Sequence, residues 1–194
     1  MTPAALVRRR NGDRRTTRTL LQISAFAATQ VVIIIALAPF TPLIAAWFPP
    51  AYALVAGLQT LMIFAARRFT GQPWAGTLAA AITGVLVAPF TAIGWLMAVP
   101  LLAAAVLFDA VMAFSDRRGW GPRRSSLGAG LVVGPVLFLV SLPVMDVAKV
   151  GVWILAATLV ARCVAFWAAA ALSARIVTRL RAAGVRRSPR PQGP

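Results

Sequence analysis

The stretch from Leu20 to Leu37, LLQISAFAATQVVIIIAL, contains no charged side chain and follows an arginine-rich segment at residues 8–18. A helix of about 20 mostly apolar residues crosses the roughly 30 Å hydrocarbon core of a bilayer. The stretch is too long for the apolar region of a signal peptide and lacks a convincing small-residue cleavage site. It therefore predicts a first transmembrane helix rather than a cleaved leader.

Similar apolar segments recur along the rest of the chain, with Pro, Gly or charged residues between them. The chain has 194 residues, a hydrophobic content of 60% and only four acidic residues, so a soluble globule could not bury its apolar surface. We expect an all-α polytopic membrane protein, a six-transmembrane-helix bundle at 19–183. A basic N-terminal segment at 1–18 and a basic, Pro-rich, disordered tail at 184–194 flank it. The expected spans are Leu20–Ala38, Ala51–Ala66, Trp74–Pro89, Ile93–Phe114, Leu127–Val144 and Val147–Val177.

The basic residues gather in alternate gaps between these segments. All but two of the 20 basic residues lie at 8–18, 67–68, 117–124 and 175–190, the exceptions being Lys149 and Arg162. Short loops rich in Lys and Arg stay in the cytoplasm. The pattern predicts a multi-pass protein of the plasma membrane with both termini cytoplasmic. A net charge of +16 without any nucleic-acid-binding pattern indicates contact with anionic lipid headgroups rather than with nucleic acid.

The chain lacks the residues that most catalytic mechanisms require. The chain has no His and a single Cys, Cys163, which excludes imidazole metal sites, Ser-His catalysis and disulfides. It has no carboxylate pair for an intramembrane protease and no phosphate-binding Gly-Lys loop. We therefore expect no enzyme activity, no metal and no cofactor, and binding or passage of a solute becomes the leading interpretation.

Two ionisable residues fall inside predicted spans, where charge is costly and usually has a partner or faces a cavity. Counted from the outer ends near Ile93 and Val150, Asp109 and Arg162 lie about 16 and 12 residues deep, or roughly 24 and 18 Å. The similar depth permits an intramembrane charge pair. Such a pair could be structural, or could take part in transport, and both residues could also snorkel toward cytoplasmic water.

Aromatic and charged residues cluster at the predicted outer face. Aromatic rings can stack on a planar or cationic solute, and a carboxylate with an ammonium can orient a polar one. The alternative is an ordinary belt of aromatic residues at the headgroups. The candidate substrate-binding residues are Trp47, Trp95, Asp146, Lys149 and Trp153. The apolar segment Leu43–Phe48 lies between prolines and is too short to cross, so it should lie in the interface or fold back inward.

Small residues form a face of the first span at helical spacing, Ser24 with Ala28 and Ala25 with Thr29. Such faces allow close helix approach. Internal packing is the ordinary use in an Ala-rich chain, and docking of another membrane subunit is the alternative.

Six short motifs are spread along the chain: Phe48–Gly57, Arg67–Arg68, Gln72–Ala80, Leu107–Phe114, Ala161–Ala169 and Leu180–Val185. They resemble motifs of the substrate-binding S-components of energy-coupling factor (ECF) transporters, closest to the hydroxymethylpyrimidine and thiamine-related branch. The resemblance covers roughly residues 19–185. Asp109 falls where that branch carries an acid in span four, whereas Thr77–Ala81 lacks the acid expected early in span three.

The resemblance implies a subunit that captures a vitamin-like solute outside the cell, such as thiamine or its hydroxymethylpyrimidine precursor. It also implies docking on a transmembrane coupling subunit driven by two cytoplasmic ATPases, with the small-residue face of span one as contact. Two alternatives stay open. The chain could be a stand-alone six-span protein with a structural or regulatory role, or a small self-sufficient carrier.

Overall fold

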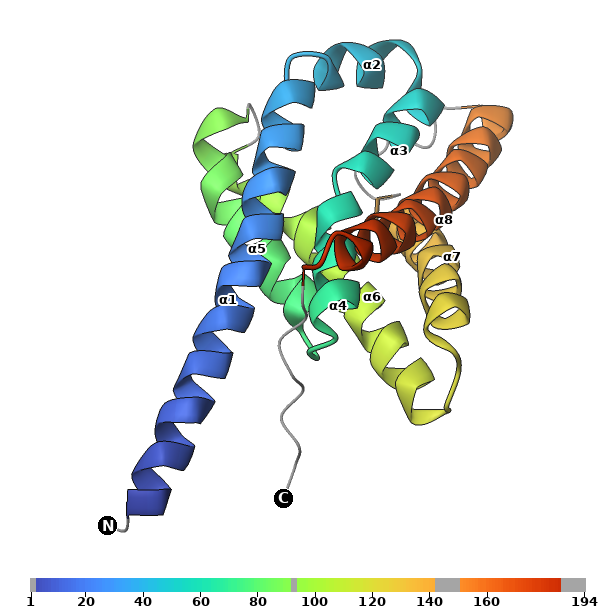
Figure 1. Ribbon diagram of the computed structural model, residues 1–194. Helices are drawn as coiled ribbons and strands as arrows, with labels where there is room; N and C mark the ends of the chain where they lie inside the picture. Colours follow the sequence, from blue (N-terminus) through green and yellow to red (C-terminus); the bar gives the residue numbers. More distant parts are fainter. Residues whose placement is uncertain (1–2, 92–93, 142–150, 186–194) are drawn as a thin grey trace.

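The computed structural model describes residues 3–91, 94–141 and 151–185, and these form helices joined by short connections (Figure 1). The helices contain the apolar segments that the sequence predicts, bounded by Pro, Gly or charge. The first helix also extends back through the basic residues 8–18, which were predicted as a separate N-terminal segment. The elements are α1 Pro3–Leu37, α2 Thr41–Trp47, α3 Pro49–Leu58, α4 Leu61–Thr70, α5 Ala75–Val87, η1 Ala88–Phe90, η2 Gly94–Met97, α6 Ala98–Arg117, α7 Pro122–Ser141 and α8 Val152–Ala182.

Six helical stretches correspond to the six predicted spans, which confirms the all-α membrane fold class. Their observed bounds lie within a few residues of the predicted ones, except at the second and the last two spans. The predicted boundary between these last two, Val144 to Val147, falls outside the described residues. Five stretches are long and apolar enough to cross a bilayer: Thr17–Leu37, Pro50–Thr70, Gly94–Arg117, Arg124–Ser141 and Val152–Ala182; the shorter sixth is Ala75–Phe90.

The connections alternate between two ends of the bundle (Figure 1). Helix α2, η1 and the start of α8 lie at the upper end of the view. The N-terminus, the α4–α5 connection and the α6–α7 connection lie at the lower end, which we call the arginine-rich end because it carries Arg67, Arg68, Arg117 and Arg118. This arrangement agrees with the predicted alternation of the connections between the two sides of the membrane. The assignment of the arginine-rich end to the cytoplasm stays a prediction.

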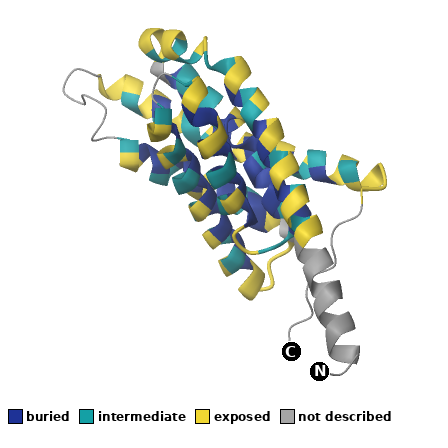
Figure 2. Ribbon diagram, turned by 90° about the vertical axis from the view of Figure 1, so that its left-hand side faces the viewer, coloured by how far each residue is buried: buried dark blue, intermediate teal, exposed yellow. Residues whose placement is uncertain are grey.

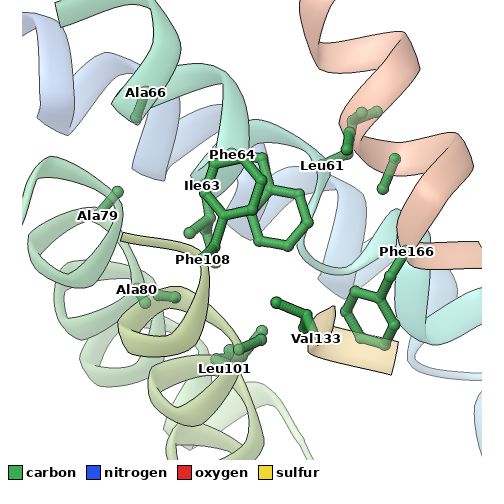
Figure 3. Close-up of a cluster of buried hydrophobic side chains, with 14 of the residues drawn as sticks. Leu61, Ile63, Phe64, Ala66, Ala79, Ala80, Leu101, Phe108, Val133 and Phe166 are labelled. Atoms are coloured by element: carbon green, nitrogen blue, oxygen red, sulfur yellow. The ribbon is translucent and has the colours of Figure 1, made fainter. Parts of the chain in front are cut away.

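Helix α4 forms the centre of the bundle. Eight of its ten residues are buried, and α1, α5 and α8 pack around it. The Phe64 ring stacks on the Phe108 ring of α6 with centroids 3.9 Å apart, and Phe166 of α8 lies 6.3 Å from Phe64 (Figure 3). Buried residues concentrate inside the bundle while its outer faces are exposed (Figure 2). The outward apolar faces are what a lipid solvent permits.

The second span is broken between α3 and α4 at Gln59 and Thr60. A break leaves backbone groups without helical partners, which is costly in hydrocarbon. The fully buried Gln30 of α1 satisfies two of them: its Nε2 donates to the Leu58 carbonyl at 3.2 Å and its Oε1 accepts from the Met62 N–H at 2.8 Å. The break is therefore a built feature that ties α1 to the second span.

Candidate functional site

A buried polar cluster joins three helices near the arginine-rich end. Arg67 of α4 and Asp109 of α6 are each 2% exposed, and the Arg67 Nε lies 3.3 Å from Asp109 Oδ1. Arg67 Nη2 also lies 3.5 Å from Oδ2 of Asp116, whose side chain is 42% exposed. The guanidinium therefore sits between two carboxylates from one face of α6, seven residues apart in sequence.

Asp109 also holds the start of α5. Its Oδ2 accepts the Thr77 backbone N–H at 2.8 Å and the Thr77 hydroxyl at 2.9 Å. The first N–H groups of a helix lack internal partners and carry partial positive charge, so a carboxylate stabilises them. Because α5 has no acidic residue in its first turn, Asp109 supplies this charge from a neighbouring helix. Gly76 permits the approach, since a Cβ there would lie 2.9 Å from Asp109 Oδ1.

The predicted partner of Asp109 is not the one in the structure. Asp109 pairs with Arg67, whereas Arg162 donates from Nη1 to the Leu137 carbonyl of α7 at 2.7 Å. This carbonyl lies near the C-terminal end of α7, where helix dipoles favour a cation. The sequence interpretation placed Arg67 in a loop after a span ending at Ala66. The helix instead continues to Thr70 and ends at Gly71, whose φ of 62° suits a glycine C-cap.

The predicted substrate-binding residues do not line a common buried site among the described residues. Trp47 of α2 is 84% exposed, Trp95 of η2 66% and Trp153 in the first turn of α8 87%. Helix α2 and the start of α8 lie at the end opposite the arginine-rich one (Figure 1), and η2 contacts η1 at the same end. Asp146 and Lys149 lie outside the described residues. In helix α2 Leu43 is also exposed and no residue is buried, so the short apolar segment lies outside the bundle. Three exposed tryptophans at one end fit either a solute entrance or an interfacial belt.

The small residues of the first span are exposed on α1. Ser24, Ala25, Ala28 and Thr29 all face outward. The opposite face of α1 is the packed one, with Ile23, Ala27, Gln30 and Ile34 buried. These four residues therefore do not pack against other helices of this chain. They form an outward-facing stripe of small residues between the exposed Leu21 and Val32, and we call these four residues the α1 stripe.

A comparison with solved structures finds a similar protein, described as an S-component of an ECF transporter. The TM-score is 0.77 over 87% of this chain and 86% of that chain, at 19% sequence identity. The chain has the S-component fold. No protein-family model and no curated protein matches the sequence. At this identity the likeness concerns the fold, while the thiamine-related branch, the solute and the partners rest on the residues themselves.

Proposed function

We propose that the chain is a membrane substrate-binding subunit of the S-component type. It captures a small vitamin-like solute at its extracellular end and docks on a transmembrane coupling subunit with two cytoplasmic ATPases. The observation that carries this proposal is the α1 stripe within this fold. Exposed small residues at a four-residue spacing suit close approach of a second helix, because each lets the partner backbone come near.

The solute entrance in this proposal is the end bearing Trp47, Trp95 and Trp153. Asp146 and Lys149 add one charge of each sign in the predicted outer connection that precedes Trp153. Such a set suits a planar, polar or cationic ring, and thiamine or hydroxymethylpyrimidine is the candidate that the resemblance favours. Asp109 takes no part in solute recognition in this scheme, because its carboxylate is already bound by Thr77 and Arg67.

Docking is tested by co-expression with a coupling subunit and two ATPases, followed by purification through the ATPases. Ala28→Trp should remove co-purification, because the ring holds the partner helix away from the stripe. Ala110→Trp is the matched control, an exposed alanine on α6 that should leave co-purification unchanged. Retention of the complex by Ala28→Trp would overturn the docking proposal and favour the stand-alone or self-sufficient carrier interpretation.

Solute capture is tested by thermal-shift titration of the detergent-purified protein with thiamine and hydroxymethylpyrimidine. A ligand that binds only the folded form raises the unfolding temperature. Trp153→Ala should weaken binding by about tenfold if a ring stacks on a cationic solute. Trp120→Ala is the control, since Trp120 is 52% exposed at the opposite end. Equal losses in the two variants would argue against an entrance at the tryptophan end.

A further inference from the structure

A cavity of about 860 Å³ opens at the arginine-rich end between α4, α6, α7 and α8. Among the described residues its lining is strongly basic, with a single acidic residue, Asp116. Five arginines line it: Arg67, Arg68, Arg175, Arg179 and Arg181. No step of the proposed solute capture or docking uses this cavity, so its charge needs a separate explanation.

The arginines of the cavity differ in how far the protein already engages them. Arg67 faces Asp109 and Asp116, and Arg181 donates from Nη2 to the Arg68 carbonyl at 3.3 Å. Arg175 and Arg179 are exposed on α8, and neither forms an ion pair with any residue that the structure describes. They lie four residues apart on one helix, where like charges repel. An anion between them would remove this repulsion.

The cavity wall changes from apolar to basic along α8. Trp167, Ala171 and Ala174 line the part nearer the middle of the bundle, and Arg175 and Arg179 line the end. Trp167 to Arg179 spans roughly 18 Å at 1.5 Å per residue. Leu127 of α7 adds to the apolar wall. A free phosphate would use only the basic part, whereas a phospholipid would use both, with its phosphate at the arginines and an acyl chain along the wall.

We propose that this cavity binds the headgroup of an anionic phospholipid, with Arg175 and Arg179 as its principal phosphate contacts. Basic pockets between transmembrane helices at a cytoplasmic surface are suited to such headgroups. Arginine provides planar, bidentate donors for phosphate oxygens. The site is independent of the proposed solute capture, because none of the tryptophans of the proposed solute entrance, Trp47, Trp95 and Trp153, lines the cavity.

The experiment compares lipid retention by native mass spectrometry of full-length protein taken from nanodiscs of phosphatidylcholine with increasing phosphatidylglycerol. The wild type should retain phosphatidylglycerol in preference to phosphatidylcholine. The double variant Arg175→Gln/Arg179→Gln should bind phosphatidylglycerol about 30-fold more weakly, because a contribution of roughly five- to sixfold per arginine multiplies over the two arginines. The matched control Arg117→Gln/Arg118→Gln removes two exposed arginines that do not line the cavity, and should retain wild-type preference.

Three results would overturn the proposal. Equal lipid loss in the two double variants would mean that general surface charge attracts the lipid. Displacement of the lipid signal by millimolar inorganic phosphate, or equal stabilisation by phosphate alone, would identify a free anion as the ligand. Unchanged lipid retention in Arg175→Gln/Arg179→Gln, together with loss of co-purification when this variant is co-expressed with the coupling subunit, would assign the cavity to a protein segment. Circular dichroism and the unfolding temperature of each variant distinguish these results from misfolding.

Discussion

Two arginines of the bundle, Arg67 of α4 and Arg162 of α8, are held in different ways. Arg67 is almost fully buried between two carboxylates, and its partner Asp109 is bonded to a third element through Thr77. Arg162 is partly exposed and, among the residues that the structure describes, has one hydrogen bond, to the Leu137 carbonyl. The Arg67–Asp109 pair therefore connects three helices, α4, α5 and α6, whereas the Arg162 charge contacts a single neighbouring helix, α7. We expect the Arg67–Asp109 pair to contribute much more to the free energy of unfolding than the Arg162 charge does.

The largest effect is expected from breaking the Arg67–Asp109 pair. Asp109→Leu leaves the Arg67 charge buried and the Thr77 N–H without its acceptor, which should lower the free energy of unfolding by about 3–5 kcal/mol. Thermal or denaturant unfolding in detergent measures the loss. Arg67→Met/Asp109→Leu should recover part of it, because the double variant leaves no unpaired buried charge.

Asp116→Asn is the control for this pair. Asp116 also faces Arg67, but its side chain is 42% exposed, so water screens the interaction. Its loss should cost less than about 1 kcal/mol. If Asp116→Asn destabilised the protein as much as Asp109→Leu, burial would not explain the difference between the two carboxylates.

An intermediate effect is expected from the glycines beside each arginine site. A Cβ at Gly76 would lie 2.9 Å from Asp109 Oδ1, and a Cβ at Gly134 would lie 2.9 Å from the Cys163 Cα next to Arg162. Gly76→Ala and Gly134→Ala should each cost about 1–3 kcal/mol through overpacking. Gly134→Ala should cost the more of the two, because it meets helix backbone rather than a side chain.

Gly128→Ala is the matched glycine control. No atom lies within 4 Å of a Cβ placed there, and Gly128 is in the same helix, α7, as Gly134. Alanine should be neutral or stabilise this helix by up to about 1 kcal/mol. A destabilisation equal to that of Gly134→Ala would show that the close contact with α8 is not the cause.

Apart from the controls, the smallest effect is expected from Arg162→Met. The variant loses a charge-assisted hydrogen bond, but it also removes the cost of holding a charge away from water, so the net change should be about 1 kcal/mol. The same unfolding measurement checks it. A loss as large as that of Asp109→Leu would require a charged partner for Arg162 and would remove the contrast between the two sites.

The sequence predicts the fold well because lipid imposes a strong pattern. Long apolar segments and alternating arginines leave few arrangements. The observed spans Thr17–Leu37, Ala75–Phe90 and Gly94–Arg117 lie within a few residues of their predicted ranges. The break at Gln59 and Thr60 was not predicted, because neither residue is a Pro or Gly and the apolar run continues on both sides. Its stability comes from Gln30, which lies 29 residues earlier in sequence than Gln59 and whose role appears only in three dimensions.

The site was predicted less completely than the fold. Asp109 and Arg162 were correctly singled out as charges within helices, but their partners depend on helix rotation, which depth alone does not specify. Arg67 was not predicted to belong to the site, because a charged residue directly after an apolar segment usually marks the start of a loop. Gly71 was the available signal, since a glycine just past a helix marks its end and places Arg67 inside the last turn.

The hydrogen bonds of Gln30 have a mechanical consequence. One amide is bonded to the last turn of α3 and to the first turn of α4, while its backbone belongs to the helix that carries the α1 stripe. Bending of the second span at its break must therefore either rupture one of these bonds or drag α1 along. Movement of α3 at its end next to α2 is thus linked through covalent and hydrogen bonds to the surface where a partner would sit.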